Sequence, residues 1–223
     1  MEQIAENVWV LQFPLRLLGV AIGRAVTVIR LSSGKVVVHS TAPFTPADLA
    51  QIRDVGEPAW LVEASKFHDS YAKSGRAALP GIPYLAPEGF AEVAGVETQP
   101  LLPAPAEWAG ELEVLELEGM PKVREHVLFH RASGTLIVAD VLFNFGRGGS
   151  AWTRFFARYV MRLREFVGMS PFFRLMIRDR AAFRRSVEEM MRWEFDRVIV
   201  AHGEIIERGG KEQLRDVLSA AGL

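Results

Sequence analysis

The sequence predicts a layered α/β fold, and three observations lead to this prediction. Short runs of β-branched and other apolar residues occupy the first part of the chain and return after residue 110. Segments with helix-capping signals lie between these runs and after them. The 223 residues are 49% hydrophobic, which is enough to bury one sizeable core or two small ones. Strands with helices interposed between them are typical of layered α/β proteins.

The first part of the chain predicts a hairpin followed by a helix and a buried strand. The expected strands are 8–13, 25–31, 36–39 and 59–62. A glycine-containing turn at 32–35 joins two of them, as a hairpin requires. Thr45, Pro46 and Asp48 then offer a hydroxyl N-cap, a proline in the first turn and a carboxylate three residues beyond the cap. A helix should therefore begin here and end near Gly56.

The second part predicts further strands and closing helices. The expected strands are 84–86, 112–117, 127–130, 135–140 and 197–202. The first of them lies among loops rich in proline and glycine, and a turn at 131–134 makes a second hairpin. Helices flank the last strand. No internal repeat divides the chain, so we expect a single domain spanning residues 1–223.

Charge and cysteine content exclude several classes of function. The chain has 26 Lys and Arg against 27 Asp and Glu, so its net charge of −1 creates no general attraction to nucleic acid. Because cysteine is absent, disulfides, thiolate metal ligands and a thiol nucleophile are excluded. Histidine nitrogen and carboxylate oxygen remain as metal ligands. We expect a cytoplasmic protein without a nucleic-acid partner.

The apolar stretch 8–31 is long enough to suggest a membrane span or a signal segment. Pro14, Arg16, Arg24 and Arg30 interrupt it, and each guanidinium group would cost about 2.5–3.5 kcal/mol in hydrocarbon. No run reaches the roughly 20 apolar residues that a spanning helix needs. We therefore expect a sheet here and no transmembrane segment.

Three polar side chains follow hydrophobic strands in a way that predicts a shared site. His68 comes shortly after the strand 59–62, and Asp140 and His202 end the strands 135–140 and 197–202. Polar residues at strand ends converge easily, because the sheet holds their backbone rigidly. Two imidazoles and a carboxylate suit one zinc, iron or manganese ion with an open position for water or substrate. With such an ion, hydrolysis of an ester, amide or phosphoester is the simplest chemistry, and iron would alternatively support redox chemistry.

Three segments resemble those of the metallo-β-lactamase-fold superfamily, and the resemblance extends over nearly the whole chain. They are Val-Val-His-Ser-Thr-Ala-Pro at 37–43, Leu-Ile-Val-Ala-Asp-Val-Leu-Phe at 136–143, and Val-Ile-Val-Ala-His-Gly-Glu at 198–204. In combination with Thr-Val-Ile-Arg-Leu at 27–31 and with His68, they resemble an uncharacterised bacterial branch of that superfamily. The resemblance implies an αββα four-layer sandwich with its site at the edge between two sheets.

The segment 64–71 departs from the superfamily's His-x-His-x-Asp-His motif. If Asp69 takes the position of the motif aspartate, Ser65, Phe67 and Ser70 replace its three histidines. If His68 is itself a motif histidine, Asp69 falls out of register. The segment 121–126 also lacks the next ligand unless His126 is shifted into that role. We therefore expect at most one metal ion, or none, and the candidate ligands are His68, Asp69, Asp140 and His202.

Each candidate has a structural alternative. Asp140 and His202 would also be explained by a hydrogen-bonded pair without metal, and His68 by a loop or helix-start position. His39 is expected to hydrogen-bond a neighbouring loop. The two histidines at positions 126 and 130, which share one face of a strand, are expected at an exposed or rim position. Tyr71 and Glu204 are candidates either for proton transfer or for orienting a ligand.

The segment 144–190 predicts a helical insert or lid. Apolar side chains recur at helical spacing from Trp152 to Val167, which predicts one buried face with arginines opposite. Residues 146–190 contain ten arginines against four acidic residues. This asymmetry suits an anionic ligand or an anionic membrane surface, but we prefer a packed helical pair with a solvated arginine face and expect no peripheral membrane contact. The glycines at 146–149 lack the Gly-Lys-Ser/Thr ending of a phosphate loop and predict a flexible turn.

These observations favour a divergent metal-dependent hydrolase of the metallo-β-lactamase fold. The catalytic residues would be His68, Asp140 and His202, and the ligand a small molecule. A serine hydrolase is disfavoured, because no Gly-x-Ser-x-Gly sequence is present. The alternative is a non-catalytic member of the same fold that has lost its metals and binds a ligand or a partner.

Overall fold

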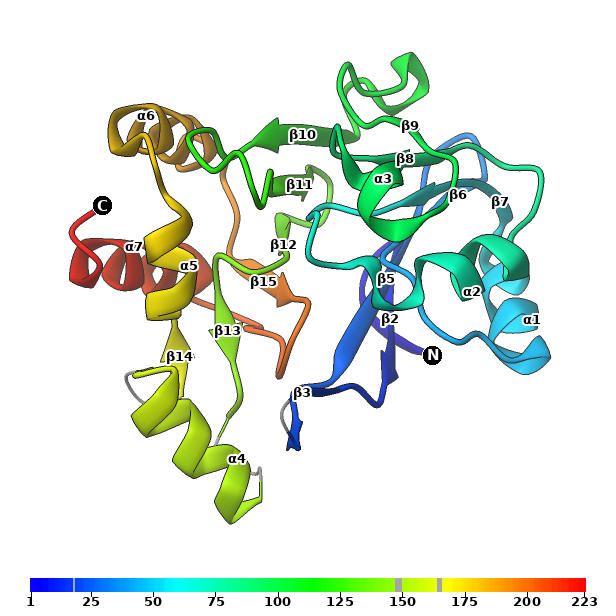
Figure 1. Cartoon of the computed structure of the whole chain (residues 1–223). Coiled ribbons are helices and arrows are strands. Elements are labelled where there is room, and N and C mark those ends of the chain that lie inside the picture. The colour runs from blue at the N-terminus through cyan, green and yellow to red at the C-terminus, as the bar shows by residue number, and fades with distance from the viewer. Residues whose placement is uncertain (18, 147–149, 164–165) are drawn as a thin grey trace.

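The computed structural model describes residues 1–17, 19–146, 150–163 and 166–223. Within these residues, two β-sheets pack face to face and are enclosed by two layers of helices (Figure 1). The seven-stranded sheet has the order β1-β2-β5-β6-β7-β8-β9, and the four-stranded sheet has the order β10-β11-β12-β15. The α/β prediction and the expected αββα sandwich are confirmed.

The seven-stranded sheet contains most of the N-terminal half of the chain. Its strands are β1 (Glu2–Ala5), β2 (Val8–Phe13), β5 (Arg24–Arg30), β6 (Lys35–His39), β7 (Glu57–Val62), β8 (Tyr84–Ala86) and β9 (Gln99–Pro100). The pairs from β1 to β6 are antiparallel, whereas β6, β7, β8 and β9 pair in parallel. The carboxyl ends of β6 and β7 therefore lie at the same edge of this sheet.

The four-stranded sheet is formed by the second half of the chain. Its strands are β10 (Leu112–Glu116), β11 (His126–His130), β12 (Thr135–Val138) and β15 (Arg197–Val200). The last two pair in parallel, with Val138 opposite Val200. Two small hairpin-like pairs complete the strands: β3 (Arg16–Leu17) with β4 (Val20–Ala21), and β13 (Phe143–Asn144) with β14 (Val167–Gly168).

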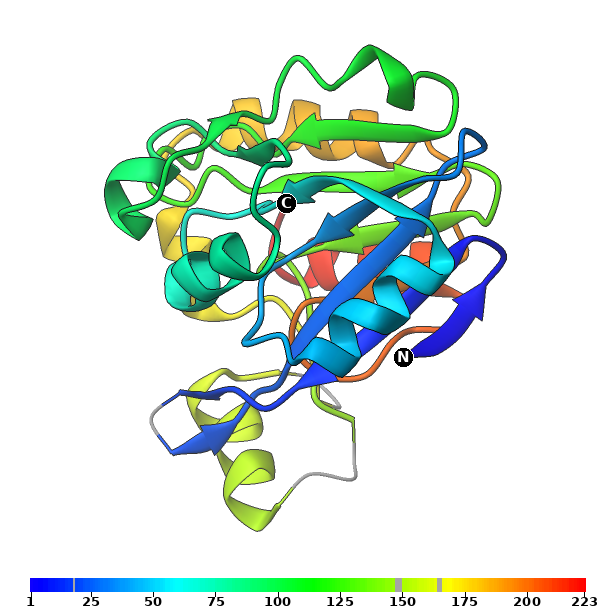
Figure 2. The ribbon, with the colours of Figure 1, turned by 90° about the vertical axis from the view of Figure 1, so that its right-hand side faces the viewer.

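Helices cover the outer face of each sheet (Figure 2). On the first sheet these are α1 (Pro46–Val55), α2 (Ala72–Ala78) and α3 (Phe90–Ala94); on the second they are α5 (Pro171–Met176), α6 (Arg180–Met190) and α7 (Gly210–Ala220). Two short 3₁₀ helices are η1 (Asp69–Tyr71) and η2 (Ala106–Trp108). The predicted capping box is present at α1, where Thr45 and Asp48 bond reciprocally, and this helix ends before Gly56 as expected.

The alternation of side chains along the strands produces the layers. In β5, Ala25 and Ile29 face the core between the two sheets, while Val26 and Val28 face the helix-covered core. Successive side chains of a strand point to opposite faces, so a strand buried on both sides is apolar throughout. This explains why the β5 sequence shows no polar alternation.

The segment after β13 differs from the expected buried amphipathic helix. Helix α4 (Ala151–Phe155) continues into one π-helical stretch, η3 (Phe156–Val160), and both lie below the sandwich in Figure 1, beside β3. Phe156 and Leu163 pack against Val20 and Ile22, but four of the expected core residues are exposed. These four are Trp152, Phe155, Tyr159 and Val160. The helical spacing predicted an apolar face that packs against the protein. Only one side of this segment does so, and the other apolar side chains remain exposed. Of the predicted turn at 146–149, residues 147–149 lie outside the described residues.

Over the part of the chain that the structure describes, no helix combines the length and the apolar character that a bilayer crossing demands.

Candidate metal centre

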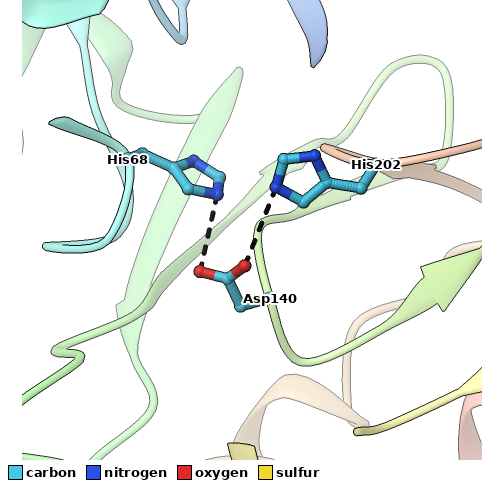
Figure 3. Close-up of side chains that lie close together, drawn as sticks. All are labelled: His68, Asp140 and His202. Carbon is cyan, nitrogen blue, oxygen red and sulfur yellow. Dashed lines mark ion pairs between the residues drawn. The ribbon is translucent and has the colours of Figure 1, made fainter. Parts of the chain in front are cut away.

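His68, Asp140 and His202 reach one point from three separate segments (Figure 3). Asp140 follows β12 and His202 follows β15, and these strands are parallel neighbours, so both residues leave the second sheet at the same edge. His68 immediately precedes η1 and comes from the first sheet through the loop after β7. One ligand atom from each residue lies within 4.8 Å of the others. The site therefore lies at the edge between the two sheets.

The three side chains are buried and face one another closely. His68 Nε2 lies 3.4 Å from Asp140 Oδ2, and His202 Nε2 lies 3.9 Å from Asp140 Oδ1. The two imidazole rings meet edge to face, with centroids 5.2 Å apart. The relative exposure of the three residues is only 2%, 8% and 5%, in chain order. Buried charged and polar groups need electrostatic or hydrogen-bond partners, and the side chains of His68, Asp140 and His202 lie chiefly against one another.

His202 is held in an orientation that leaves one nitrogen bare. Its Nδ1 donates a hydrogen bond to the carbonyl oxygen of Gly23, at 2.7 Å, so Nε2 faces Asp140 without a proton. The ring of Phe143 stacks on the imidazole, with centroids 5.7 Å apart and an interplanar angle of 10°. Burial, together with the neighbouring His68, lowers the pKa of His202 to about 4. A neutral imidazole with a free Nε2 is the form that binds metals.

Asp140 is ionised despite its burial. Desolvation opposes the charged form, but His68, His202 and the hydroxyl of Ser65 outweigh it and hold the pKa of the carboxyl below its usual range. Ser65 Oγ donates to Asp140 Oδ2 at 2.9 Å. In one of the two registers considered for segment 64–71, Ser65 replaces a motif histidine. In the structure this serine orients the carboxylate of Asp140.

His68 lies between two carboxylates. Its Nδ1 is 3.7 Å from Oε2 of Glu63, which is fully buried, and neither ring nitrogen of His68 makes a hydrogen bond of good geometry. Glu63 Oε1 accepts bonds from the backbone N–H and the hydroxyl of Thr41, at 2.7 and 2.6 Å. Burial and Arg24 lower the pKa of His68, but the two carboxylates raise it above its usual value overall. Buried polar atoms without partners are rare, and these nitrogens mark a place for a ligand.

A third buried carboxyl group, that of Glu125, fixes the backbone that carries Asp140. It accepts hydrogen bonds from the N–H groups of Ala139, Asp140 and Val141, at 3.0, 3.0 and 3.1 Å. Burial and the charge of Asp140 raise the pKa of Glu125 to about 8, against the effect of the three donors.

Sequence reasoning missed both Glu63 and Glu125. Glu63 had a usable signal, since it ends a hydrophobic strand as Asp140 does.

The remaining candidates do not join this group. Asp69 begins η1, is only partly buried and lies outside the group of His68, Asp140 and His202. The hydroxyl of Tyr71 donates to the carbonyl oxygen of Pro14, at 3.1 Å. Glu204 is exposed, and its described hydrogen bonds are made by its backbone.

Three other histidines differ from their expected settings. His39 is buried without a hydrogen bond on either ring nitrogen, so the expected bond to a loop is wrong. His126 and His130 are both buried rather than exposed at a rim, because β11 lies between two neighbouring strands. The Nδ1 of each is hydrogen-bonded, to the carbonyl oxygen of Arg124 and to the hydroxyl of Ser133.

The setting of His39 predicts a pH dependence of stability. Burial, which Glu63 offsets only in part, lowers the pKa of His39 to about 4 in the folded protein, against 6.5 in the unfolded chain. Below pH 6.5 the unfolded state binds the additional proton, so this residue should lower the free energy of unfolding by up to about 3 kcal/mol between pH 6.5 and 4. Urea denaturation of wild type and His39→Gln across this range measures the effect as the difference between the two curves. Parallel curves would contradict it.

The three side chains form the floor of a cavity of about 570 Å³. Arg24 joins them at the floor. The walls are predominantly apolar and come from β3 and the residues beside it, from Phe67 and Phe143, and from η3 and α5. The site is therefore accessible to a small molecule despite the burial of its polar groups.

Solved structures with the same arrangement of sheets and helices identify the fold. TMB-1 superposes with a TM-score of 0.66 at 16% identity over 100% of this chain and 97% of its own. A metallo-β-lactamase from Erythrobacter litoralis gives 0.65 at 17% identity, over 98% and 95% of the two chains. FIM-1 from Pseudomonas aeruginosa, a metallo-β-lactamase in its mono-zinc form, gives 0.63 at 14% identity, over 100% and 95%.

The chain therefore has the metallo-β-lactamase fold. No protein-family model matches its sequence, and no curated protein matches it either.

Proposed function

We propose that this protein is a hydrolase that depends on one divalent metal ion held by His68, Asp140 and His202. The observation that carries the proposal is the convergence of two imidazoles and an ionised carboxylate, from three segments, within 4.8 Å of one another. The nitrogens of His68 have no hydrogen bond, and Nε2 of His202 is bare, so both residues offer a free donor atom once His68 is neutral. The mono-zinc form of FIM-1 gives a precedent for one ion in this fold.

The donor set fits zinc, iron or manganese. These ions accept imidazole and carboxylate ligands, and three protein ligands leave a coordination position for substrate or water. When bound, such an ion would supply Lewis-acid polarisation of a carbonyl or phosphoryl oxygen. Ser65, Glu63 and the carbonyl of Gly23 each lie against one of the three ligands and orient it.

A single ion is proposed rather than two. Across residues 1–17, 19–146, 150–163 and 166–223, no second group of three His, Asp or Glu side chains shares this spacing. Asp69 lies outside the group and is not included in the proposed ligand set.

Ligand binding without catalysis is the second candidate. The contact of 3.4 Å between His68 and Asp140 favours it, since these residues also form a stable buried ion pair when His68 is protonated. The two candidates differ in whether metal enters the site.

Metal analysis tests the proposal. We expect protein purified without chelator, or reconstituted with zinc, to contain one metal ion per chain by mass spectrometry and by calorimetric titration. His202→Ala should lose this ion, because one of three ligands is removed. His130→Ala is the matched control, since this histidine is equally buried but lies outside the group. Only traces of metal in wild type, or equal metal content in wild type and His202→Ala, would exclude the metal-dependent hydrolase and leave the binding role.

A further inference from the structure

We propose that the cavity above the candidate metal centre binds a long acyl chain, and that the substrate is a single-chain lipid-like ester. The binding part of this inference stands on the cavity alone, whereas the hydrolysis part rests on the proposed function. Hydrolysis of such an ester would add water across the ester C–O bond and release a fatty acid and an alcohol. The arrangement of polar and apolar groups in the cavity carries the argument.

Most of the polar lining of the cavity is buried. Its polar floor consists of Arg24, His68, Asp140 and His202, each at most 8% exposed. Arg16, Ser70 and Ser170 are the other polar residues of the described lining, and the rest of this lining is apolar. Leu15 and Leu17 come from the segment around β3, Phe156 and Val160 from the α4–η3 helix, and Phe172 and Phe173 from α5. Such a cavity fits a ligand with one polar end, held at the floor, and an apolar remainder along the walls.

The volume of the cavity favours a ligand larger than a short polar ester. About 570 Å³ lies well within the range of roughly 300–1,000 Å³ that drug-sized ligands fill. A short polar ester would cover the floor and leave the apolar walls in contact with water. Each additional methylene group buried there contributes about 0.8 kcal/mol, which corresponds to a factor of about four in affinity.

The exposed rim of the cavity, its mouth, is mainly apolar, although Arg16 and Ser70 also line it and are exposed. Leu17, Phe67, Val160 and Phe172 line the cavity and at the same time expose 53%, 40%, 52% and 59% of their surface. The ring centroids of Phe67, from the loop after β7, and Phe172, from α5, lie 6.1 Å apart. Large apolar side chains that gather at an exposed rim mark a binding surface. An acyl chain that extends through the mouth would cover them.

The described part of segment 144–190 supplies one wall of this cavity. Phe156, Val160 and Phe172 all belong to it. Its other exposed apolar residues, among them Tyr159 and Leu175, do not line the cavity. These two provide matched controls, because each lies on the same helical segment as a lining residue.

Binding is tested with a dansyl-labelled undecanoate as the probe. We expect saturable fluorescence enhancement with wild-type protein, whether zinc-loaded or treated with chelator. Val160→Arg and Phe172→Arg, which place a charge at the mouth, should weaken binding at least tenfold. Tyr159→Arg and Leu175→Arg should change it less than twofold. No saturable binding by wild type, or equal losses in all four variants, would overturn the proposal.

Hydrolysis is tested with p-nitrophenyl esters of two to ten acyl carbons and zinc-loaded protein. We expect kcat/KM to rise by up to about fourfold for each added methylene, and this rise to be lost in Phe172→Arg but not in Leu175→Arg. Saturable probe binding without hydrolysis of any ester would overturn the proposed hydrolase and retain the acyl-chain site. Hydrolysis that is indifferent to chain length would overturn the acyl-chain site and retain the hydrolase.

The acyl chain of the ligand could reach the cavity from solution or from a membrane, and vesicle flotation distinguishes these two sources. Flotation of wild type with phosphatidylglycerol vesicles that is lost in Phe172→Arg would assign the acyl chain to membrane lipid. Binding of the free probe without flotation would assign it to a dissolved ester.

Discussion

Replacing Glu125 with alanine is expected to lower the free energy of unfolding by about 3–5 kcal/mol. The carboxylate accepts three hydrogen bonds from the consecutive N–H groups of Ala139, Asp140 and Val141, and all these groups are buried. Each buried N–H without a partner costs about 1–3 kcal/mol. The same substitution should weaken zinc binding, because these three bonds hold the strand end that presents Asp140. Urea denaturation and calorimetric titration with zinc measure the two effects.

Glu125→Gln is the matched variant. Its amide oxygen can keep the bonds of Ala139 and Val141, which share one carboxylate oxygen, but its NH₂ group would then face the N–H of Asp140. The expected loss is about 1–3 kcal/mol, between those of wild type and alanine. A loss below 1 kcal/mol for Glu125→Ala would show that Glu125 does not hold this backbone.

Replacing Gly203 with alanine is expected to cost about 4 kcal/mol or more and to displace His202. Gly203 has a φ of +112°, and a Cβ there would lie 1.8 Å from the carbonyl oxygen of Asn144. This close approach joins the end of β15 to β13, since Glu204 N–H donates to the same oxygen at 2.6 Å. The backbone must therefore move at the residue next to a proposed ligand. Thermal denaturation and zinc titration of the variant measure the result.

Gly209→Ala separates backbone strain from steric overlap. Gly209 also has a positive φ, of +68°, but a Cβ there would have no atom within 4 Å. This substitution should cost only about 1–2 kcal/mol and leave zinc binding unchanged. Equal losses in the two variants would refute the argument from close packing at Gly203.

Local patterns predicted most of the elements that form the scaffold. The β-branched runs predicted β5, β6 and β15, and the Thr45 capping box predicted the start of α1. The sequence also predicted that Asp140 and His202 converge at strand ends, and the structure shows why: β12 and β15 are parallel neighbours, so both residues leave the sheet at one edge. The expectation that His68 joins them agrees with the geometry, although metal binding at this point stays a prediction.

Burial and partners could not be predicted from these patterns. Helical spacing predicted an apolar face from Trp152 onward, but whether other residues cover such a face depends on the rest of the fold. His126 and His130 were expected at a rim and are enclosed in the sheet instead. The role of Glu125 depends on backbone N–H groups some 15 residues away, whose direction is set only when β11 and β12 pair.

The sequence by itself determined a layered α/β fold, which its family resemblance narrowed to an αββα sandwich, the strand ends that carry Asp140 and His202, and the absence of any thiol chemistry. Only the tertiary structure decided that Asp69 lies outside the group, that Glu63 and Glu125 support it, and that an apolar cavity opens above it. The physical reason is the range of the interactions. Alternation and capping act between residues close in the chain, whereas hydrogen-bond partners, burial and cavities arise between segments that meet only after folding.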